Sequence, residues 1–98
     1  MRDNYLICYD IANKKRLNKV FRYLKARGVH LQYSVFFCSF TRVQFKEAIE
    51  NLNRLIDKGK DDVRIYPLPG VVKVSIMGKG SRLPEGVVYG NSGSFWDA

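Results

Sequence analysis

The sequence has few of the residues that form covalent cross-links or the common catalytic sets. It contains two cysteines, Cys8 and Cys38, and a single histidine, His30. The cysteines form no CxxC pair, lack the spacing of a metal site, and each lie in an apolar stretch. We therefore expect two free, buried thiols and a reducing, cytoplasmic location. No Ser/His/Asp or Cys/His set can be argued, and His30 is a weak candidate proton carrier, with a structural role as the alternative.

Long apolar runs and phosphate-binding loops are also absent. No segment approaches the ~18 apolar residues of a transmembrane helix, and the N-terminus lacks the pattern of a secretory signal. The "GKG" at 78–80 lacks the context of a P-loop, and no GxGxxG occurs. The 98 residues predict one domain, residues 1–90, followed by a C-terminal tail, residues 91–98.

Acidic residues are missing from one contiguous third of the chain. No acid lies between residues 11 and 46, where nine bases occur: Lys14, Lys15, Arg16, Lys19, Arg22, Lys25, Arg27, Arg42 and Lys46. The net charge is +8, yet the rest of the chain holds eight bases (17 − 9) and all nine acids. A merely solvated helix face is the ordinary alternative, but such a face normally intersperses both signs. The charge pattern therefore favours a polyanionic partner, a nucleic acid.

Hydrophobic periodicity predicts an α+β order of elements. Strands are expected at 5–9, 30–40, 63–68, 71–77 and 86–90. A helix is expected over 14–27 after the N-cap Asn13, and a second helix begins at Thr41 with the spacing of a capping box. This β-α-β(β)-α-β-β order predicts both helices on one face of an antiparallel sheet.

The segment "YSVFFCSF" (33–40) is apolar on both of its alternating faces. Tyr33, Val35 and Phe37 would share one face, and Phe36, Cys38 and Phe40 the other. A sheet with helices on one side should be polar on the other. We therefore expect a second copy of the chain to cover that face, giving a homodimer.

Asp10 closes the first predicted strand, and three interpretations of it are open. Its carboxylate would accept backbone hydrogen bonds near the helix start, pair with Lys14 or Arg16, or bind a divalent cation. One carboxylate is a poor metal site by itself. Two copies meeting face to face would bring two Asp10 side chains to one cleft, where a nucleic acid supplies further oxygens.

The chain resembles the small CRISPR-associated adaptation protein family, Cas two, often described as endoribonucleases. The resemblance rests on "YLICYDI" with Asp10, "KKR" at 14–16, "QYSVF" at 32–36 and "VRIYPL" at 63–68. It implies a ferredoxin-like βαββαβ fold with an extra C-terminal strand that commonly extends the partner's sheet, and a homodimer. It also implies Mg2+-dependent cleavage of RNA or DNA, with Asp10 as the metal ligand from each subunit.

The resemblance further implies a bridging role between dimers of the larger adaptation integrase. The chain departs from the family pattern where His30 replaces a frequent Arg, Phe37 a frequent acid, and Leu17 a base of some members. The missing Arg bears on catalysis more than on fold. Two ferredoxin strands must also fit within residues 30–40, which predicts a bent strand or tight hairpin near Ser34.

The charge pattern and the resemblance together favour a nucleic-acid enzyme, which the resemblance implies is a homodimeric, metal-dependent endonuclease that takes part in spacer acquisition and antiviral defence. Asp10 would be catalytic and would hold Mg2+, and phosphate contacts would come from Lys14, Lys15, Arg16 and Lys19. The alternative is a non-catalytic DNA-binding adaptor with the same fold and dimer. A distant alternative is a small-molecule-binding ferredoxin-like regulatory domain.

Overall fold

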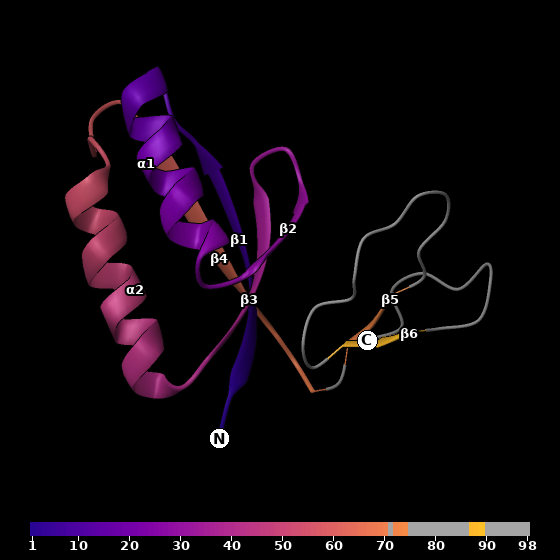
Figure 1. Cartoon of the computed structure of the whole chain (residues 1–98). Helices are drawn as coiled ribbons and strands as arrows, with labels where there is room; N and C mark the ends of the chain where they lie inside the picture. Colours follow the sequence, from indigo (N-terminus) through magenta and orange to yellow (C-terminus); the bar gives the residue numbers. More distant parts are fainter. Residues whose placement is uncertain (71, 75–86, 90–98) are drawn as a thin grey trace.

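The computed structural model describes residues 1–70, 72–74 and 87–89. Its elements are β1 (Asp3–Asp10), α1 (Lys14–Lys25), β2 (Val29–Gln32), β3 (Val35–Phe40), α2 (Arg42–Leu55), β4 (Asp62–Leu68), β5 (Val72–Val74) and β6 (Val87–Tyr89). The first four strands form an antiparallel sheet in the order β2-β3-β1-β4. Both helices lie on one face of this sheet (Figure 1). The predicted ferredoxin-like α+β fold is confirmed.

Local capping explains where the two helices begin. The side chain of Asn13 accepts a hydrogen bond from the Arg16 amide at 3.0 Å, which satisfies one free donor of the first turn of α1. Thr41 and Gln44 form the predicted capping box, with reciprocal hydrogen bonds of 3.2 and 3.0 Å. Both predicted helix starts are therefore confirmed.

Helix α1 ends at Lys25, two residues before the predicted end, and the chain then turns at Gly28. The Gly28 amide donates to the Leu24 carbonyl at 2.8 Å. A Cβ at Gly28 would lie 2.5 Å from both the Cys38 Sγ and the Phe37 carbonyl oxygen. The chain can therefore pass this close to β3 only because position 28 has no side chain.

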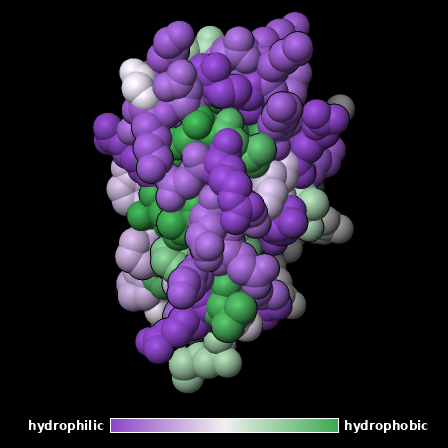
Figure 2. All heavy atoms as spheres, turned by 90° about the vertical axis from the view of Figure 1, so that its left-hand side faces the viewer, coloured by the Kyte–Doolittle hydropathy of each residue, from purple (hydrophilic) through white to green (hydrophobic). Residues whose placement is uncertain are grey.

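The core lies between the sheet and the helices. Its completely buried side chains are Ile7, Val20, Leu24, Phe36 and Cys38. Figure 2 views the molecule from the helix side, where the outer surface is mainly hydrophilic and apolar side chains show between hydrophilic ones. Burial raises the pKa of the Cys38 thiol to about 12. Cys38 is thus the inert core thiol that the sequence predicts, whereas Cys8 is only half-buried. Neither helix of the described residues is long and apolar enough to cross a membrane.

Residues 29–40 form a tight hairpin near Ser34, one of the two arrangements that the resemblance predicted for this segment. Gln32 pairs with Val35, which leaves Tyr33 and Ser34 as the two loop residues. The register shifts between His30 and Gln32, so β2 carries a bulge. Tyr33 adopts a φ of 40°, a left-handed conformation that is unusual for a bulky residue.

The strand register defines the sheet face that carries no helix. Leu6 pairs with Phe37 and Tyr66, and Cys8 pairs with Val35 and Arg64, so these side chains share that face. Phe37 is only 2% exposed, while Tyr66 is 46% exposed. Strand β3 is therefore apolar on both faces, as predicted, and the homodimer that this pattern suggests stays a prediction.

The C-terminal part contains the two further strands expected from the sequence, each shorter than predicted. β5 and β6 pair in parallel with each other as a separate two-stranded sheet. The resemblance implied that a C-terminal strand extends the main sheet, commonly that of a partner. The predicted tail, residues 91–98, lies outside the described residues.

Candidate active site

Asp10 is the last residue of β1, and its side chain is exposed. Because side chains alternate along a strand and Ile7 and Tyr9 are buried toward the helices, Asp10 belongs to the helix-free face. The register places Asp62 of β4 directly opposite Asp10. Residues paired in this way have Cβ atoms about 4.5–5.5 Å apart, so two carboxylates meet at this end of the sheet.

The structure narrows the three interpretations of Asp10. Within residues 1–70, the ion pairs are Arg16–Asp61 and Arg64–Asp62, and no hydrogen bond engages the Asp10 side chain. Two interpretations, pairing with Lys14 or Arg16 and acceptance of backbone hydrogen bonds, are therefore wrong for the described part of the chain. Its carboxylate is instead available to a ligand from outside.

The described residues supply only part of a metal site. They contain no group of three or more His, Cys, Asp or Glu residues placed to hold one ion. Magnesium prefers six oxygen ligands and commonly takes one or two protein carboxylates plus waters and phosphate oxygens. Asp10 fits that role as one carboxylate ligand. The Asp62 carboxylate accepts a hydrogen bond from Arg64 Nε at 2.9 Å.

Asp61 lies in the loop before β4, and its carboxylate is buried next to the end of β1. Its side chain is 0% exposed and forms a two-point ion pair with Arg16, at 2.7 Å to Nε and 3.1 Å to Nη2. It also accepts from the backbone amides of Ala12 at 3.0 Å and Asp57 at 2.8 Å. The hydrogen bond from Arg16 holds the pKa of Asp61 well below its usual range. Asp61 thus ties the loop after Asp10 to the start of α1 and to the loop before β4.

Because of this ion pair, Arg16 differs from the other predicted phosphate contacts, Lys14, Lys15 and Lys19, which form no ion pair within the described residues. The Arg16 side chain is 26% exposed, and the pKa of its guanidinium is raised mainly by the hydrogen bond to Asp61. A phosphate would have to compete with a buried carboxylate for this guanidinium. Arg16 is therefore better explained as an anchor of the loop than as a free phosphate ligand.

Lys14, Lys15 and Lys19, which we call the lysine surface, lie exposed on the first two turns of α1. No carboxylate of the described residues forms an ion pair with them. The first turn of α1 contains no acid, so these charges stand at the positive end of the helix dipole without compensation. An external polyanion would relieve this repulsion.

His30 has a structural role in the hairpin. Its ring lies 5.2 Å from that of Phe21, edge to face, and 4.9 Å from that of Phe36. Its Nε2 is hydrogen-bonded to the Tyr33 carbonyl. Because a carbonyl oxygen only accepts, Nε2 carries a proton in this contact. The structural alternative for His30 is therefore the one that the contacts favour.

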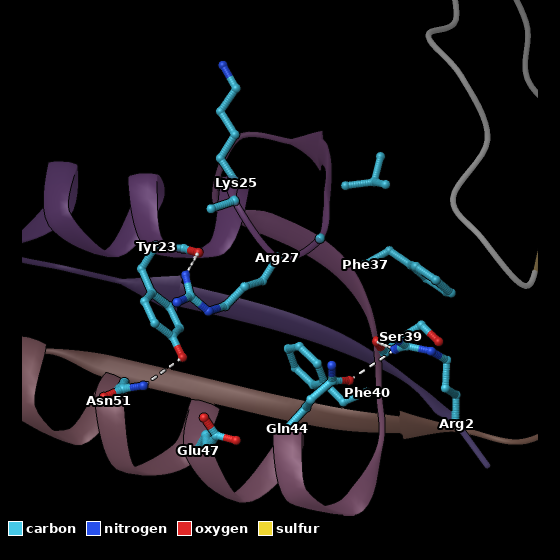
Figure 3. A pocket seen from close by; sticks show the side chains of 13 residues that line it. Arg2, Tyr23, Lys25, Arg27, Phe37, Ser39, Phe40, Gln44, Glu47 and Asn51 are labelled. Carbon is cyan, nitrogen blue, oxygen red and sulfur yellow. Dashed lines mark hydrogen bonds between the residues drawn. The ribbon is translucent and has the colours of Figure 1, made fainter.

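A cavity of about 600 Å³ lies at the other end of β1 (Figure 3). The Arg27 guanidinium stacks on the Tyr23 ring at 3.8 Å, and Asn51 donates to the Tyr23 hydroxyl at 3.1 Å. Arg2 donates to the Ser39 carbonyl at 2.6 Å. These hydrogen bonds join α2 to α1, and the residue that precedes β1 to β3. Asp10 does not line this cavity, so the cavity is separate from the candidate active site.

Known proteins share this arrangement of elements and much of this sequence. CRISPR-associated endoribonuclease Cas2 2 of Thermodesulfovibrio yellowstonii is 51% identical over 87 residues, covering 89% of this chain and 96% of that protein. CRISPR-associated endoribonuclease Cas2 1 of Nitrosomonas europaea is 40% identical over 93 residues, covering 95% and 88%.

Solved structures agree with these sequence relatives. A hypothetical protein from Thermus thermophilus superposes with a TM-score of 0.73 at 35% identity, covering 87% of this chain and all of that one. Streptococcus pyogenes Cas2 superposes with a TM-score of 0.64 at 32% identity, covering 67% and 86%. The family model described as CRISPR associated protein Cas2 matches residues 3–72. The chain therefore belongs to the Cas2 family.

Proposed function

We propose that this protein is a homodimeric, metal-dependent endonuclease that cleaves phosphodiester bonds of RNA or DNA during CRISPR adaptation and antiviral defence. The observation that carries the proposal is the exposed Asp10 carboxylate, which has no partner in the described part of the chain and lies three residues before the N-cap of the helix that bears the lysine surface. The names of the relatives, endoribonuclease and endonuclease, support a hydrolase acting on nucleic acid.

In this proposal, the residues of the chain have three roles: binding phosphate, holding the metal ion and fixing the loop between these two sites. Lys14, Lys15 and Lys19 bind backbone phosphates and hold the strand at the end of the sheet. Asp10 of each of two copies holds Mg2+, and the ion, when bound, activates water and offsets the charge on the phosphate oxygens. The Arg16–Asp61 pair fixes the loop that joins Asp10 to these lysines.

The helix-free face of the sheet supports the proposed homodimer. Leu6, Val35 and the 46%-exposed Tyr66 share this face, and Asp10 lies at its end. Apolar burial between two such faces would favour association, and a two-fold axis would bring the two Asp10 carboxylates together. A second copy is also the simplest source of the ligand that a single chain lacks.

A second candidate function is a non-catalytic adaptor that bridges the larger adaptation integrase on DNA. The incomplete metal site favours it, because within the described residues no third ligand accompanies Asp10 and Asp62. Such an adaptor needs the lysine surface and the dimer but not the Asp10 carboxylate.

Asp10→Asn separates the two candidates, with Asp3→Asn as the control because Asp3 is an exposed aspartate at the opposite end of the same strand. Cleavage of single-stranded RNA, single-stranded DNA and duplex DNA is measured with Mg2+ and with a chelator. The nuclease proposal expects cleavage by wild type and Asp3→Asn, and loss with Asp10→Asn or chelator while binding persists. Equal cleavage by Asp10→Asn refutes it. No cleavage by wild type, with spacer acquisition that survives Asp10→Asn, supports the adaptor.

A further inference from the structure

A small aromatic pocket lies beside α1, on the same side of the sheet as the helices. Its volume is about 400 Å³, and it is lined by Tyr9, Leu17, Asn18, Phe21, Tyr33 and Ser34. Tyr9 immediately precedes Asp10, and its amide donates to the Ser34 carbonyl at 3.1 Å. This bond joins the tip of the hairpin to the end of β1, so the pocket lies at the same end of the sheet as Asp10, on the opposite face.

Tyr33 stands out at the rim of this pocket. It is 88% exposed, although a large aromatic ring would ordinarily be buried. Its φ of 40° occurs at the first of two hairpin-loop positions, where asparagine, aspartate or glycine is the usual residue. The hydrogen bond from His30 to its carbonyl holds this backbone in place. The exposed Tyr33 ring contributes little to packing, so packing does not explain the strained backbone that presents it. Residues with unusual backbone angles are often found at ligand sites.

Positive charge flanks the pocket along α1. Lys14 precedes the pocket residue Asn18 by four positions, so the two are neighbours on the helix surface. Lys25 Nζ lies 5.7 Å from the ring centroid of Phe21, another lining residue. A ligand that fits this surface has a flat apolar part for the pocket and negative charge on either side of it. A nucleotide within a strand has this chemistry.

We propose that the pocket receives an unpaired nucleobase, which stacks on the Tyr33 ring while the flanking phosphates bind the lysine surface. This inference rests on the proposed binding of nucleic acid and adds to it a subsite for one unpaired base. Bases within a duplex are stacked on one another and cannot enter the pocket. Stacking on an aromatic ring accepts every base, so the pocket selects for single strands rather than for sequence.

The test measures binding of a fluorescent oligonucleotide to the full chain by anisotropy, with three ligands of one length. These are a single strand, the same strand with consecutive abasic sites, and a duplex. Wild-type protein is expected to bind the abasic strand at least about 5-fold more weakly than the intact strand. Equal affinities for the two strands overturn the proposal without any variant being needed.

Two substitutions at one position then assign the effect to the ring. Tyr33→Asn removes the ring but tolerates the left-handed backbone, and Tyr33→Phe keeps the ring. Tyr33→Asn should lose about 5-fold or more on the intact strand and less than about 2-fold on duplex, whereas Tyr33→Phe should bind as wild type. Equal losses on intact and abasic strands would mean a structural effect and would overturn the proposal.

The lysine surface supplies the remaining comparison. Lys14→Gln with Lys15→Gln should weaken single strand and duplex alike. If it does so while Tyr33→Asn changes nothing, the base pocket is refuted and the phosphate surface stands. If the lysine variant binds as wild type, the proposed phosphate surface itself fails.

Discussion

Neutralising the lysine surface should change the salt dependence of nucleic-acid binding by a defined amount. Each phosphate that a cation neutralises contributes about −0.9 to the slope of log K against log salt on duplex DNA, and about −0.7 on a single strand. Lys14, Lys15 and Lys19 are exposed and carry no ion pair with the described acids. Replacing all three by Gln should therefore make the duplex slope shallower by about 2.7. Between 50 and 200 mM salt, that difference amounts to roughly 40-fold in affinity.

The assay is fluorescence anisotropy with a short duplex at several salt concentrations. Arg42→Gln with Lys46→Gln is the matched control, because both residues are exposed cations at the start of α2, at the other end of the molecule from the start of α1 (Figure 1). Removing cations from the positive end of α1 should raise the free energy of unfolding by a few tenths of a kcal/mol, so lost binding would not reflect lost folding. An unchanged slope in the triple variant, or an equal change per charge in the control, refutes the reasoning.

Three further predictions follow from the described contacts. Asp61→Asn should lower the free energy of unfolding and make it depend less on pH in acid. The pKa of Asp61 is lower in the folded than in the unfolded chain. Its carboxylate therefore stabilises the fold above the unfolded pKa, near 3.9, and this stabilisation is lost as the pH falls. Urea unfolding between pH 2 and 7 measures this difference, and equal pH profiles of the variant and wild type would contradict it. Gly28→Ala should cost about 1–3 kcal/mol in urea unfolding, since its Cβ would lie 2.5 Å from Cys38 Sγ, and an unchanged midpoint would show the backbone can yield. A thiol reagent should label Cys8 far faster than Cys38, whose pKa is near 12, and equal rates would disprove its burial.

Much of the fold could be predicted because its signals are local. The Asn13 cap, the Thr41 capping box and the alternating strands each act within a few residues of the chain. The hairpin near Ser34 was also predictable, since residues 30–40 had to hold two strands of the expected fold.

The candidate site was only partly predictable, because its geometry depends on contacts between distant segments. Asp10 and the lysines could be named from their place in the sequence. That Asp62 lies opposite Asp10 follows from the β1–β4 register, which no local pattern encodes. The Arg16–Asp61 ion pair spans 45 residues and removes Arg16 from the free cations. The left-handed backbone at Tyr33 was not predictable, because the residues that usually mark such a turn, glycine and asparagine, are absent from this position.

The stoichiometry of metal binding tests the central claim most directly. Mn2+ can stand in for Mg2+ and can be titrated by electron paramagnetic resonance into the full-length protein at a concentration where its oligomeric state is measured in parallel. If two copies share one site through their Asp10 carboxylates, wild type binds one ion per two chains and Asp10→Asn binds none. One ion per chain in a monomer, or unchanged binding by Asp10→Asn, would contradict the account.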